Sequence, residues 1–296
     1  MAEPKIGIVG IPGKWSTEAL ADAVEARTGF RLVIDMADVV LDLHERRLMH
    51  GDVDLCALDG LVIKKISESY SPHALDRLEM LRLPEAAGVR VFSPPNAILR
   101  TIDRLACTVT LCNGGIPMPE TLVTESVDQA VEAVGRLGTA VFKPLYSTKA
   151  RGMAVINGST PDREIRAAVE AFHADNPVMY LQRKLDLPGR DLGLVFLKGN
   201  YLGAYARVAG GEAWNTTIHS GGRYASFEPP GEWIDLAKRA VDLFGLDFTT
   251  VDLAETADGP VIFEVSAFGG FRGAKEGAAI DAAALYVDHV LERVRP

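Results

Sequence analysis

The chain has 296 residues, 48% of them hydrophobic and 24% charged, and is long enough for two or three packed units. Its formal net charge of −9 offers no basic footprint for nucleic acid. We expect a cytoplasmic location without membrane contact, because no apolar run reaches the roughly 20 residues that span a bilayer and no N-terminal signal segment is evident. The three cysteines and six histidines show no metal-ligand spacing, which argues against a structural zinc site.

Residues 1–96 alternate short apolar runs with helical segments. Strands are expected at 5–9, 32–34, 61–66 and 89–92. Helices are expected after Ser16, a capping residue type, and from Ser71 and Pro72, which suit the start of a helix. This alternation with short connections predicts an open α/β sheet. The glycines at 7, 10 and 13 do not fit G-x-G-x-x-G, which disfavours a nicotinamide cofactor.

The two prolines at 94 and 95 mark a boundary. The elements expected after it are a helix at 97–112, strands at 121–124, 140–143 and 153–156, and helices at 127–137 and 161–174. They predict a compact α+β lobe over residues 97–181. Residues 182–296 contain further strands and helices, a hairpin near Asp258 and a final helix at 281–293, and should form a second lobe.

The hairpin carries a pair of carboxylates. Its strands are expected at 248–253 and 261–265, with turn residues between them. If the hairpin is centred on Asp258, Asp252 lies opposite Glu264, and both point away from the apolar face of Val251 and Val265. Two facing like charges oppose folding unless a divalent cation offsets them, and oxygen ligands suit magnesium. A solvated outer face is the alternative.

Residues 246–270 read L-D-F-T-T-V-D-L-A-E-T-A-D-G-P-V-I-F-E-V-S-A-F-G-G, and with them the chain resembles the ATP-grasp superfamily. Within it, the chain is most similar to the branch of ribosomal-protein S6 and lysine-biosynthesis amino-acid ligases. The resemblance covers nearly the whole chain and implies an α/β ATP-grasp fold, in which an N-terminal α/β domain precedes two α+β lobes that clasp ATP. It implies Mg²⁺ or Mn²⁺ on Asp252 and Glu264, with Ser266 where the family has asparagine. Because serine is a weaker ligand, the number of metal ions stays open.

Three segments resemble the parts of the family that contact ATP. V-F-K-P at 141–144 resembles the strand-end lysine that meets the phosphates, which assigns this role to Lys143; a lysine at the end of an apolar strand is costly unless it meets an anion. The flexible loop over the phosphates is similar to residues 145–153, which assigns phosphate contacts to Ser147, Thr148, Lys149, Arg151 and Gly152. The linker that reads adenine with backbone groups is similar to residues 180–185, which include Gln182, Arg183 and Lys184. Arg183 replaces the acidic residue of the family.

The remaining site residues also follow from the resemblance. It places Asp191 on the ribose and Arg207 against the transferred phosphate, where it would stabilise developing charge. Asn215 and Thr217 lie in a segment that contacts phosphate and metal, and they stand where the family has R-S-N, so one positive charge is missing. The expected substrate contacts are His219 and Arg272, the latter as a bidentate partner of a carboxylate or, alternatively, in a surface salt bridge.

The resemblance implies a carboxylate–amine ligase that works through an acylphosphate. The segments F-E-V-S-A-F-G-G-F-R-G and K-P-L-Y-S-T-K-A-R-G-M resemble the ATP-grasp members of the GAK systems, which implies a small partner protein or peptide as a possible acceptor. The alternatives are a phosphotransferase on the same fold and a non-catalytic nucleotide-binding scaffold. Relatives also make a homo-oligomer possible.

Overall fold

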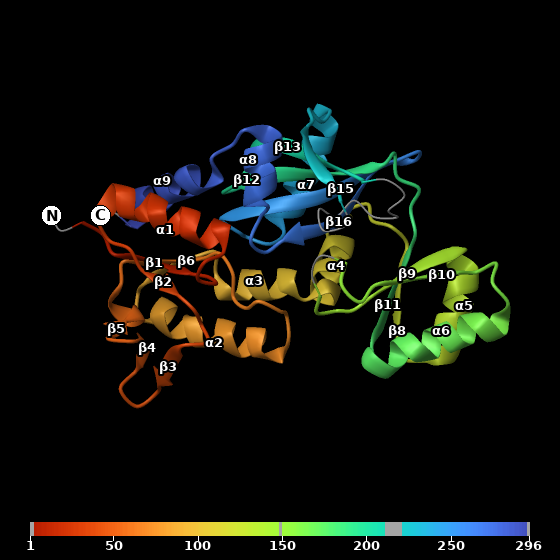
Figure 1. Ribbon diagram of the computed structural model, residues 1–296, viewed down its shortest axis with the longest axis horizontal. Helices are drawn as coiled ribbons and strands as arrows, with labels where there is room; N and C mark the ends of the chain where they lie inside the picture. The colour runs from red at the N-terminus through yellow and green to blue at the C-terminus, as the bar shows by residue number, and fades with distance from the viewer. Residues whose placement is uncertain (1–2, 148–149, 211–220, 295–296) are drawn as a thin grey trace.

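The computed structural model describes residues 3–147, 150–210 and 221–294. Figure 1 shows three regions: an N-terminal unit at the left, a large lobe across the top, and a small lobe that stands out to the right. Among the helices of these residues, none combines the length and apolar character needed to cross a bilayer.

The N-terminal unit is built on a parallel sheet with the strand order β2-β1-β6-β7. Its strands are β1 (Ile6–Val9), β2 (Val33–Ile34), β6 (Gly60–Ile63) and β7 (Arg90–Phe92), and its helices are α1 (Trp15–Thr28) and α2 (Pro72–Ala86). The prediction of an open α/β sheet is therefore confirmed. The expected cap at Ser16 is wrong: α1 begins at Trp15, and the Glu18 carboxylate accepts a hydrogen bond from Gly13 N at 2.6 Å.

The chain segment that connects β2 to β6 forms a separate small antiparallel sheet, which was not predicted. It consists of β3 (Val39–Asp42), β4 (Arg47–His50) and β5 (Val53–Asp54), followed by the short helix η1 (Leu55–Ala57). The segment does not alternate between apolar and polar residues, because some of its apolar residues face solvent: Val40 is 65% exposed and Leu43 is 73% exposed. Periodicity therefore gave no strand signal in this segment.

The single helix expected at 97–112 is wrong. The segment forms α3 (Pro95–Ile102) and α4 (Arg104–Asn113), which are separated by Asp103. The Asp103 carboxylate accepts hydrogen bonds from the backbone N–H groups of Leu105 (2.9 Å) and Ala106 (3.2 Å) and so caps α4. An aspartate inside a helical pattern can start a new helix in this way, and here it places Arg104 at the first position of α4.

The small lobe is an antiparallel sheet with the order β10-β9-β11-β8, covered on one face by two helices. Its elements are β8 (Thr121–Thr124), α5 (Val127–Leu137), β9 (Thr139–Lys143), β10 (Ala154–Asn157), α6 (Asp162–Asp175) and β11 (Met179–Arg183). Phe142, Ile156 and Leu181 face the helices and belong to a core of the lobe's own. Because side chains alternate along a strand, Lys143 and Gln182 lie on the opposite face.

The large lobe holds an antiparallel sheet with the order β14-β13-β12-β15-β16. Its elements are β12 (Arg190–Leu197), β13 (Asn200–Val208), β14 (Arg223–Ser226), α7 (Gly231–Asp242), β15 (Phe248–Thr256), β16 (Gly259–Ser266), α8 (Phe271–Ala278) and α9 (Ala282–Val294). α9 packs against α1 of the N-terminal unit, and one buried cluster joins Ile98 and Leu111 to Ile262 and Val265. The division at 96 and 181 stays a prediction.

Candidate functional site

Asp252 and Glu264 lie directly opposite each other on β15 and β16, as the hairpin pattern predicted. The turn itself is tighter than assumed, because Thr256 pairs with Gly259 around two residues. A β-bulge at Phe263 then restores the predicted pairing of the carboxylates. The bulge changes the apolar face: Ile262 and Val265 are fully buried, whereas Phe263 leaves the core and its ring centroid lies 5.2 Å from Lys143 Nζ. The strict alternation of inward and outward side chains along β16 therefore breaks at Phe263.

A buried ion-pair network surrounds Asp252. Arg207 on β13 donates two hydrogen bonds to Asp191, at 3.0 and 2.6 Å, and its Nη2 atom lies 3.0 Å from Asp252 Oδ2. Burial raises the pKa of Asp252 to about 7; Arg207 lowers it, and the Glu264 and Asp191 carboxylates raise it further. Burial acts to lower the pKa of Arg207, but Asp252 and Asp191 outweigh it and hold that pKa well above its usual range. A ribose hydroxyl would have to compete with Arg207 for Asp191.

Arg104 is a site residue that the sequence reasoning missed. Its Nη1 atom lies 3.7 Å from Glu264 Oε2, and its guanidinium also donates to the carbonyl oxygens of Pro144 (3.1 Å) and Ser147 (3.4 Å). One side chain thus links β16, the end of β9 and the loop after it. No local pattern around residue 104 signals this role, because the three contacts come from distant segments of the chain.

Lys143 lies at the end of β9, where it was expected. Its ammonium group donates a hydrogen bond to Gln182 Oε1, and Gln182 in turn donates to Thr121 Oγ1 (3.0 Å) and Tyr180 Oη (3.2 Å). Burial lowers the pKa of Lys143 to about 7; Arg104 lowers it further, and Glu264 opposes the shift. A buried amine of this kind would regain its full charge beside an anion.

The linker residues after Gln182 use their backbone N–H groups within the protein. Arg183 N donates to Glu120 O at 2.8 Å, and Lys184 N donates to Thr139 O at 2.9 Å. The Arg183 guanidinium contacts the Glu120 carboxylate at 2.5 Å and so points to the surface. Backbone contacts to an adenine would therefore use groups other than these two N–H donors.

The loop over residues 145–153 is described except for Thr148 and Lys149, which lie outside the described residues. The Ser147 hydroxyl is buried and has no hydrogen-bond partner among the described residues. Gly152 has a φ of 69°, the left-handed conformation that glycine adopts readily. Arg151 is exposed and adds to the positive charge that lowers the pKa of Glu68, mainly a consequence of Lys14.

Of the remaining expected residues, the structure describes Ser266 and Arg272. Asn215, Thr217 and His219 lie outside the described residues. Ser266 ends β16 opposite Thr250, two residues beyond Glu264 and so on the same face. Arg272 lies on α8, paired with Glu276 at 3.5 Å and 5.8 Å from the Trp15 ring centroid, so the salt bridge that we considered as an alternative is present.

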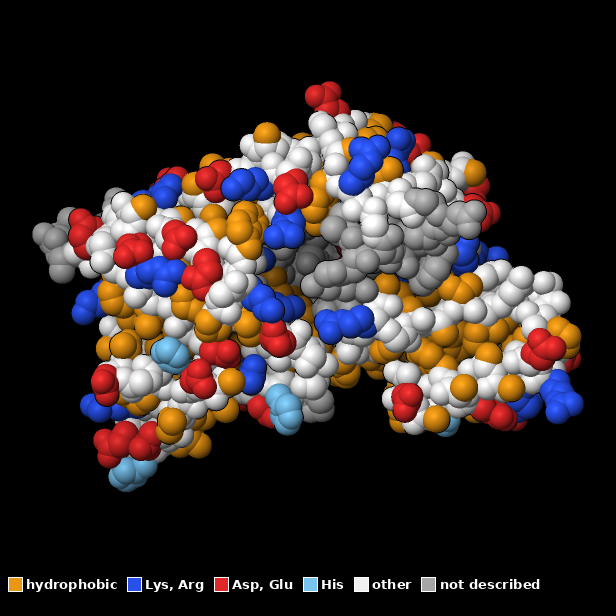
Figure 2. Space-filling view, viewed as in Figure 1, with side chains coloured by type: hydrophobic (Ala, Val, Ile, Leu, Met, Phe, Trp, Pro, Cys, Tyr) orange, Lys and Arg blue, Asp and Glu red, His pale blue; other side chains and the backbone are white. Residues whose placement is uncertain are grey.

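The described residues contain no group of three or more histidine, cysteine or acidic side chains that could hold a metal ion. A cation on Asp252 and Glu264 would therefore complete its shell with waters and substrate oxygens, as magnesium often does. In Figure 2, several lysine and arginine side chains lie near the middle of this face, to the left of the small lobe.

A second residue that sequence reasoning missed is Lys64, just beyond β6. Its ammonium donates to Phe268 O (2.6 Å) and Gly269 O (3.2 Å) and lies 4.2 Å from the Phe271 ring centroid. Lys64 thus links the N-terminal unit to the segment that follows Ser266. Burial, with a smaller contribution from Lys65, lowers its pKa to about 7.

The fold and these residues define an ATP-grasp enzyme, and the comparisons with known proteins agree. The chain belongs to the RimK-like ATP-grasp domain family, which matches residues 101–290. It is 26% identical over 268 residues to the tetrahydromethanopterin:alpha-L-glutamate ligase of Methanosarcina acetivorans, covering 86% of this chain and 83% of that protein. It is also 26% identical over 294 residues to a probable alpha-L-glutamate ligase of Stenotrophomonas maltophilia, covering 95% and 96%.

Two solved structures share the fold over nearly their whole length. The ATP-grasp ligase PsnB, in complex with a minimal precursor, superposes with a TM-score of 0.76 at 20% identity and covers 99% of both chains. D-alanyl-alanine synthetase A from Vibrio cholerae gives 0.72 at 15% identity, again with 99% of both chains. The protein is therefore an ATP-grasp carboxylate–amine ligase that forms C–N bonds, as the sequence predicted.

Proposed function

We propose that the protein activates a substrate carboxylate with ATP and Mg²⁺ and joins it to an amine, at a centre formed by Asp252, Glu264, Lys143 and Arg207. The carrying observation is the facing pair Asp252–Glu264, with Arg207 beside one carboxylate and Arg104 beside the other. Two acidic groups held together by two arginines can exchange these partners for a cation and phosphates. PsnB has been solved with Mg and ADP, which supports the same cofactors here.

The donor set fits magnesium. Asp252 and Glu264 offer carboxylate oxygens on one face of the hairpin, and Ser266 offers a hydroxyl on the same face. Once bound, the ion would supply positive charge that offsets the negative charge of the phosphates during phosphoryl transfer. The side-chain exposures, 17% for Asp252 and 44% for Glu264, leave both carboxylates within reach of a ligand.

The surrounding residues position the reactants. We assign Lys143 to the non-transferred phosphates, because its buried amine sits at a strand end beside Glu264 and Arg104. We assign Arg207 to the transferring group, because it is the cation nearest to Asp252 among the described residues. The substrate carboxylate oxygen bonds to the γ-phosphorus as the bond to the ADP oxygen breaks. The amine nitrogen then bonds to the acyl carbon, phosphate leaves with the C–O electron pair, and the nitrogen loses a proton.

The loop over residues 145–153 would shield this acylphosphate from water. Arg104 donates to the carbonyl oxygen of Pro144, just before the loop, and to that of Ser147 within it, and so anchors the base of the loop to the site. Exclusion of water matters because hydrolysis of the acylphosphate would waste ATP.

We infer that the amine substrate is an acidic amino acid, with L-glutamate as the first compound to test. The support comes from relatives named as alpha-L-glutamate ligases, which align along most of the chain. For the carboxylate substrate, we propose a small partner protein or peptide of the kind implied by the likeness to GAK systems. PsnB and the macrocyclase MdnC, both of the same fold, have been solved with precursor peptides.

The test is identification of the product. The protein is incubated with ATP, Mg²⁺, isotope-labelled L-glutamate and a cell extract, and products are read by mass spectrometry. We expect a product, either a peptide or a small molecule, that carries one added labelled glutamyl residue. ADP should form in an amount equal to this product. The variant Glu264→Gln should form neither product. Glu255→Gln is the control and should behave as the parent, because Glu255 is a half-buried carboxylate on the same hairpin that pairs with Arg190 of β12 rather than facing the site. Transfer of phosphate to a stable ester without an amide would refute the proposal.

A further inference from the structure

A buried hydrogen-bond network runs behind Lys143, across the face of the small-lobe sheet that is turned away from α5 and α6. Lys143 donates to Gln182 Oε1, and Gln182 Nε2 donates to both Thr121 Oγ1 (3.0 Å) and Tyr180 Oη (3.2 Å). The Tyr180 hydroxyl also bonds to Thr108 Oγ1 at 3.0 Å. Gln182 is 2% exposed and Tyr180 is 1% exposed. These five residues form the Tyr180 network.

The Thr108 end of the network sets the direction of the Tyr180 hydroxyl. Thr108 Oγ1 donates its single hydrogen to Arg104 O at 2.9 Å. In the bond between Thr108 and Tyr180, the tyrosine is therefore the donor. Because its one hydrogen is used there, Tyr180 Oη can act toward Gln182 only as an acceptor.

Thr121 sets the second acceptor. Its hydroxyl donates to Pro119 O at 2.8 Å, so toward Gln182 it too can only accept. The Gln182 amide nitrogen carries two hydrogens and uses one on Thr121 and one on Tyr180. The amide oxygen is therefore left to face Lys143. The reverse orientation would bring N–H groups against the ammonium and leave buried polar groups unpaired.

Tyr180 also lies beside the second cation of the site. The guanidinium carbon of Arg104 is 5.9 Å from the centroid of the Tyr180 ring. Thr108, which bonds the tyrosine hydroxyl, lies one turn after Arg104 on α4. Arg104 Nη1 in turn lies 3.7 Å from Glu264 Oε2. One buried tyrosine therefore connects the position of Lys143 in the small lobe to that of the arginine beside the carboxylate pair.

We propose that Tyr180 is a positioning residue for nucleotide binding, which fixes the Gln182 amide so that its oxygen holds the Lys143 ammonium in place for the phosphates. The inference rests on the phosphate role proposed above for Lys143. One hydrogen of the ammonium bonds to Gln182, and two remain for phosphate oxygens. Without the tyrosine hydroxyl, one buried N–H of the amide loses its acceptor, and the two amide orientations come closer in free energy. Nucleotide should then bind more weakly, although every residue that contacts it is unchanged.

A double-mutant cycle tests this inference, with calorimetric titration of the full chain by a non-hydrolysable ATP analogue and Mg²⁺. Tyr180→Phe keeps the ring and removes the hydroxyl, and it should weaken binding about threefold to tenfold. In a Lys143→Met background the same change should leave the affinity unchanged, because no ammonium remains to be held. A Gln182→Met background should likewise abolish the effect, because it removes the link between the two residues.

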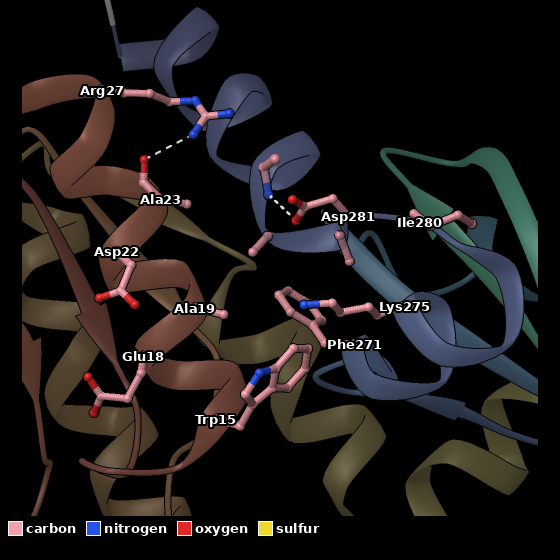
Figure 3. Close-up of a pocket in the computed structure, with 13 residues that line it drawn as sticks. Trp15, Glu18, Ala19, Asp22, Ala23, Arg27, Phe271, Lys275, Ile280 and Asp281 are labelled. Carbon is pink, nitrogen blue, oxygen red and sulfur yellow. Dashed lines mark hydrogen bonds between the residues drawn. The ribbon is translucent and has the colours of Figure 1, made fainter. Parts of the chain in front are cut away.

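Tyr286→Phe is the control. Tyr286 is likewise a buried tyrosine, and its ring centroid lies 5.4 Å from that of Phe248. It belongs to α9, which packs against α1 (Figure 3). The cavity of about 460 Å³ that Figure 3 shows at this contact has no member of the Tyr180 network in its described lining. The nucleotide affinity of this variant should therefore equal the parent's, whatever the change in thermal stability.

The outcomes separate this inference from the proposed function. If Tyr180→Phe weakens binding equally in the parent and in Lys143→Met, the tyrosine acts on the lobe as a whole, and the positioning role is overturned. Parent-like affinity in Tyr180→Phe, together with weaker binding in Lys143→Met, overturns it as well but leaves the phosphate role of Lys143 standing. If Lys143→Met binds the analogue as tightly as the parent, that phosphate role fails, and the inference that rests on it fails too.

Discussion

Lys143 should take up a proton when nucleotide binds. Burial lowers its pKa to about 7 in the free protein, with Arg104 adding to the shift. At pH 8 only about 10% of these amines carry a proton. Phosphate oxygens beside the amine favour its charged form and restore the pKa toward its usual value. Binding at pH 8 should therefore take up about 0.9 proton at this residue.

The sign of the pH dependence follows from the same shift. The bound form holds the proton more tightly than the free form, so nucleotide affinity is greatest below pH 7 and falls as the pH rises above it. The dissociation constant should rise about fivefold from pH 7 to pH 8 and about tenfold from pH 8 to pH 9.

Calorimetry with a non-hydrolysable ATP analogue and Mg²⁺, in buffers of different ionisation enthalpy, measures the proton uptake. Lys143→Met should bind more weakly and take up no proton at this position. Lys64→Met is the matched control, because Lys64 has a similarly lowered pKa but bonds to Phe268 and Gly269 rather than facing the carboxylate pair. Uptake that is absent in the parent, or unchanged in Lys143→Met, would refute the reasoning.

Two further predictions concern stability. Between pH 7 and pH 9.5 Lys64 carries a proton in the unfolded chain that it lacks in the folded chain. In urea unfolding, the parent's free energy of unfolding should therefore rise with pH by up to about 1.4 kcal/mol per pH unit relative to that of Lys64→Met. A difference between the two proteins that does not change with pH would contradict this. Gly273→Ala should lower the free energy of unfolding by about 1–3 kcal/mol, because the added Cβ would lie 2.3 Å from the Tyr205 ring; a thermal midpoint equal to the parent's would count against that contact.

The fold was predictable wherever a short stretch carried its own signal. The strands before Gly10 and Lys143, the helix that starts at Pro72 and the hairpin around Asp258 follow from local apolar runs, proline and turn residues. Two predictions failed where local signals misled: Asp103 starts a new helix within an apparently continuous one, and exposed apolar residues hide the strands at 39–50. Asp252 still pairs with Glu264 as predicted, because the bulge at Phe263 compensates for the incorrectly predicted turn.

The sequence by itself determined the facing carboxylates Asp252 and Glu264 and the lysine at the end of its strand, because each depends on residues close to it in the chain. Only the tertiary structure decided their surroundings, in which Arg207 lies between two aspartates and Arg104 bridges two lobes. The physical reason is that a strand pattern sets the direction of a side chain, whereas burial and charge at a site depend on how distant segments pack against it.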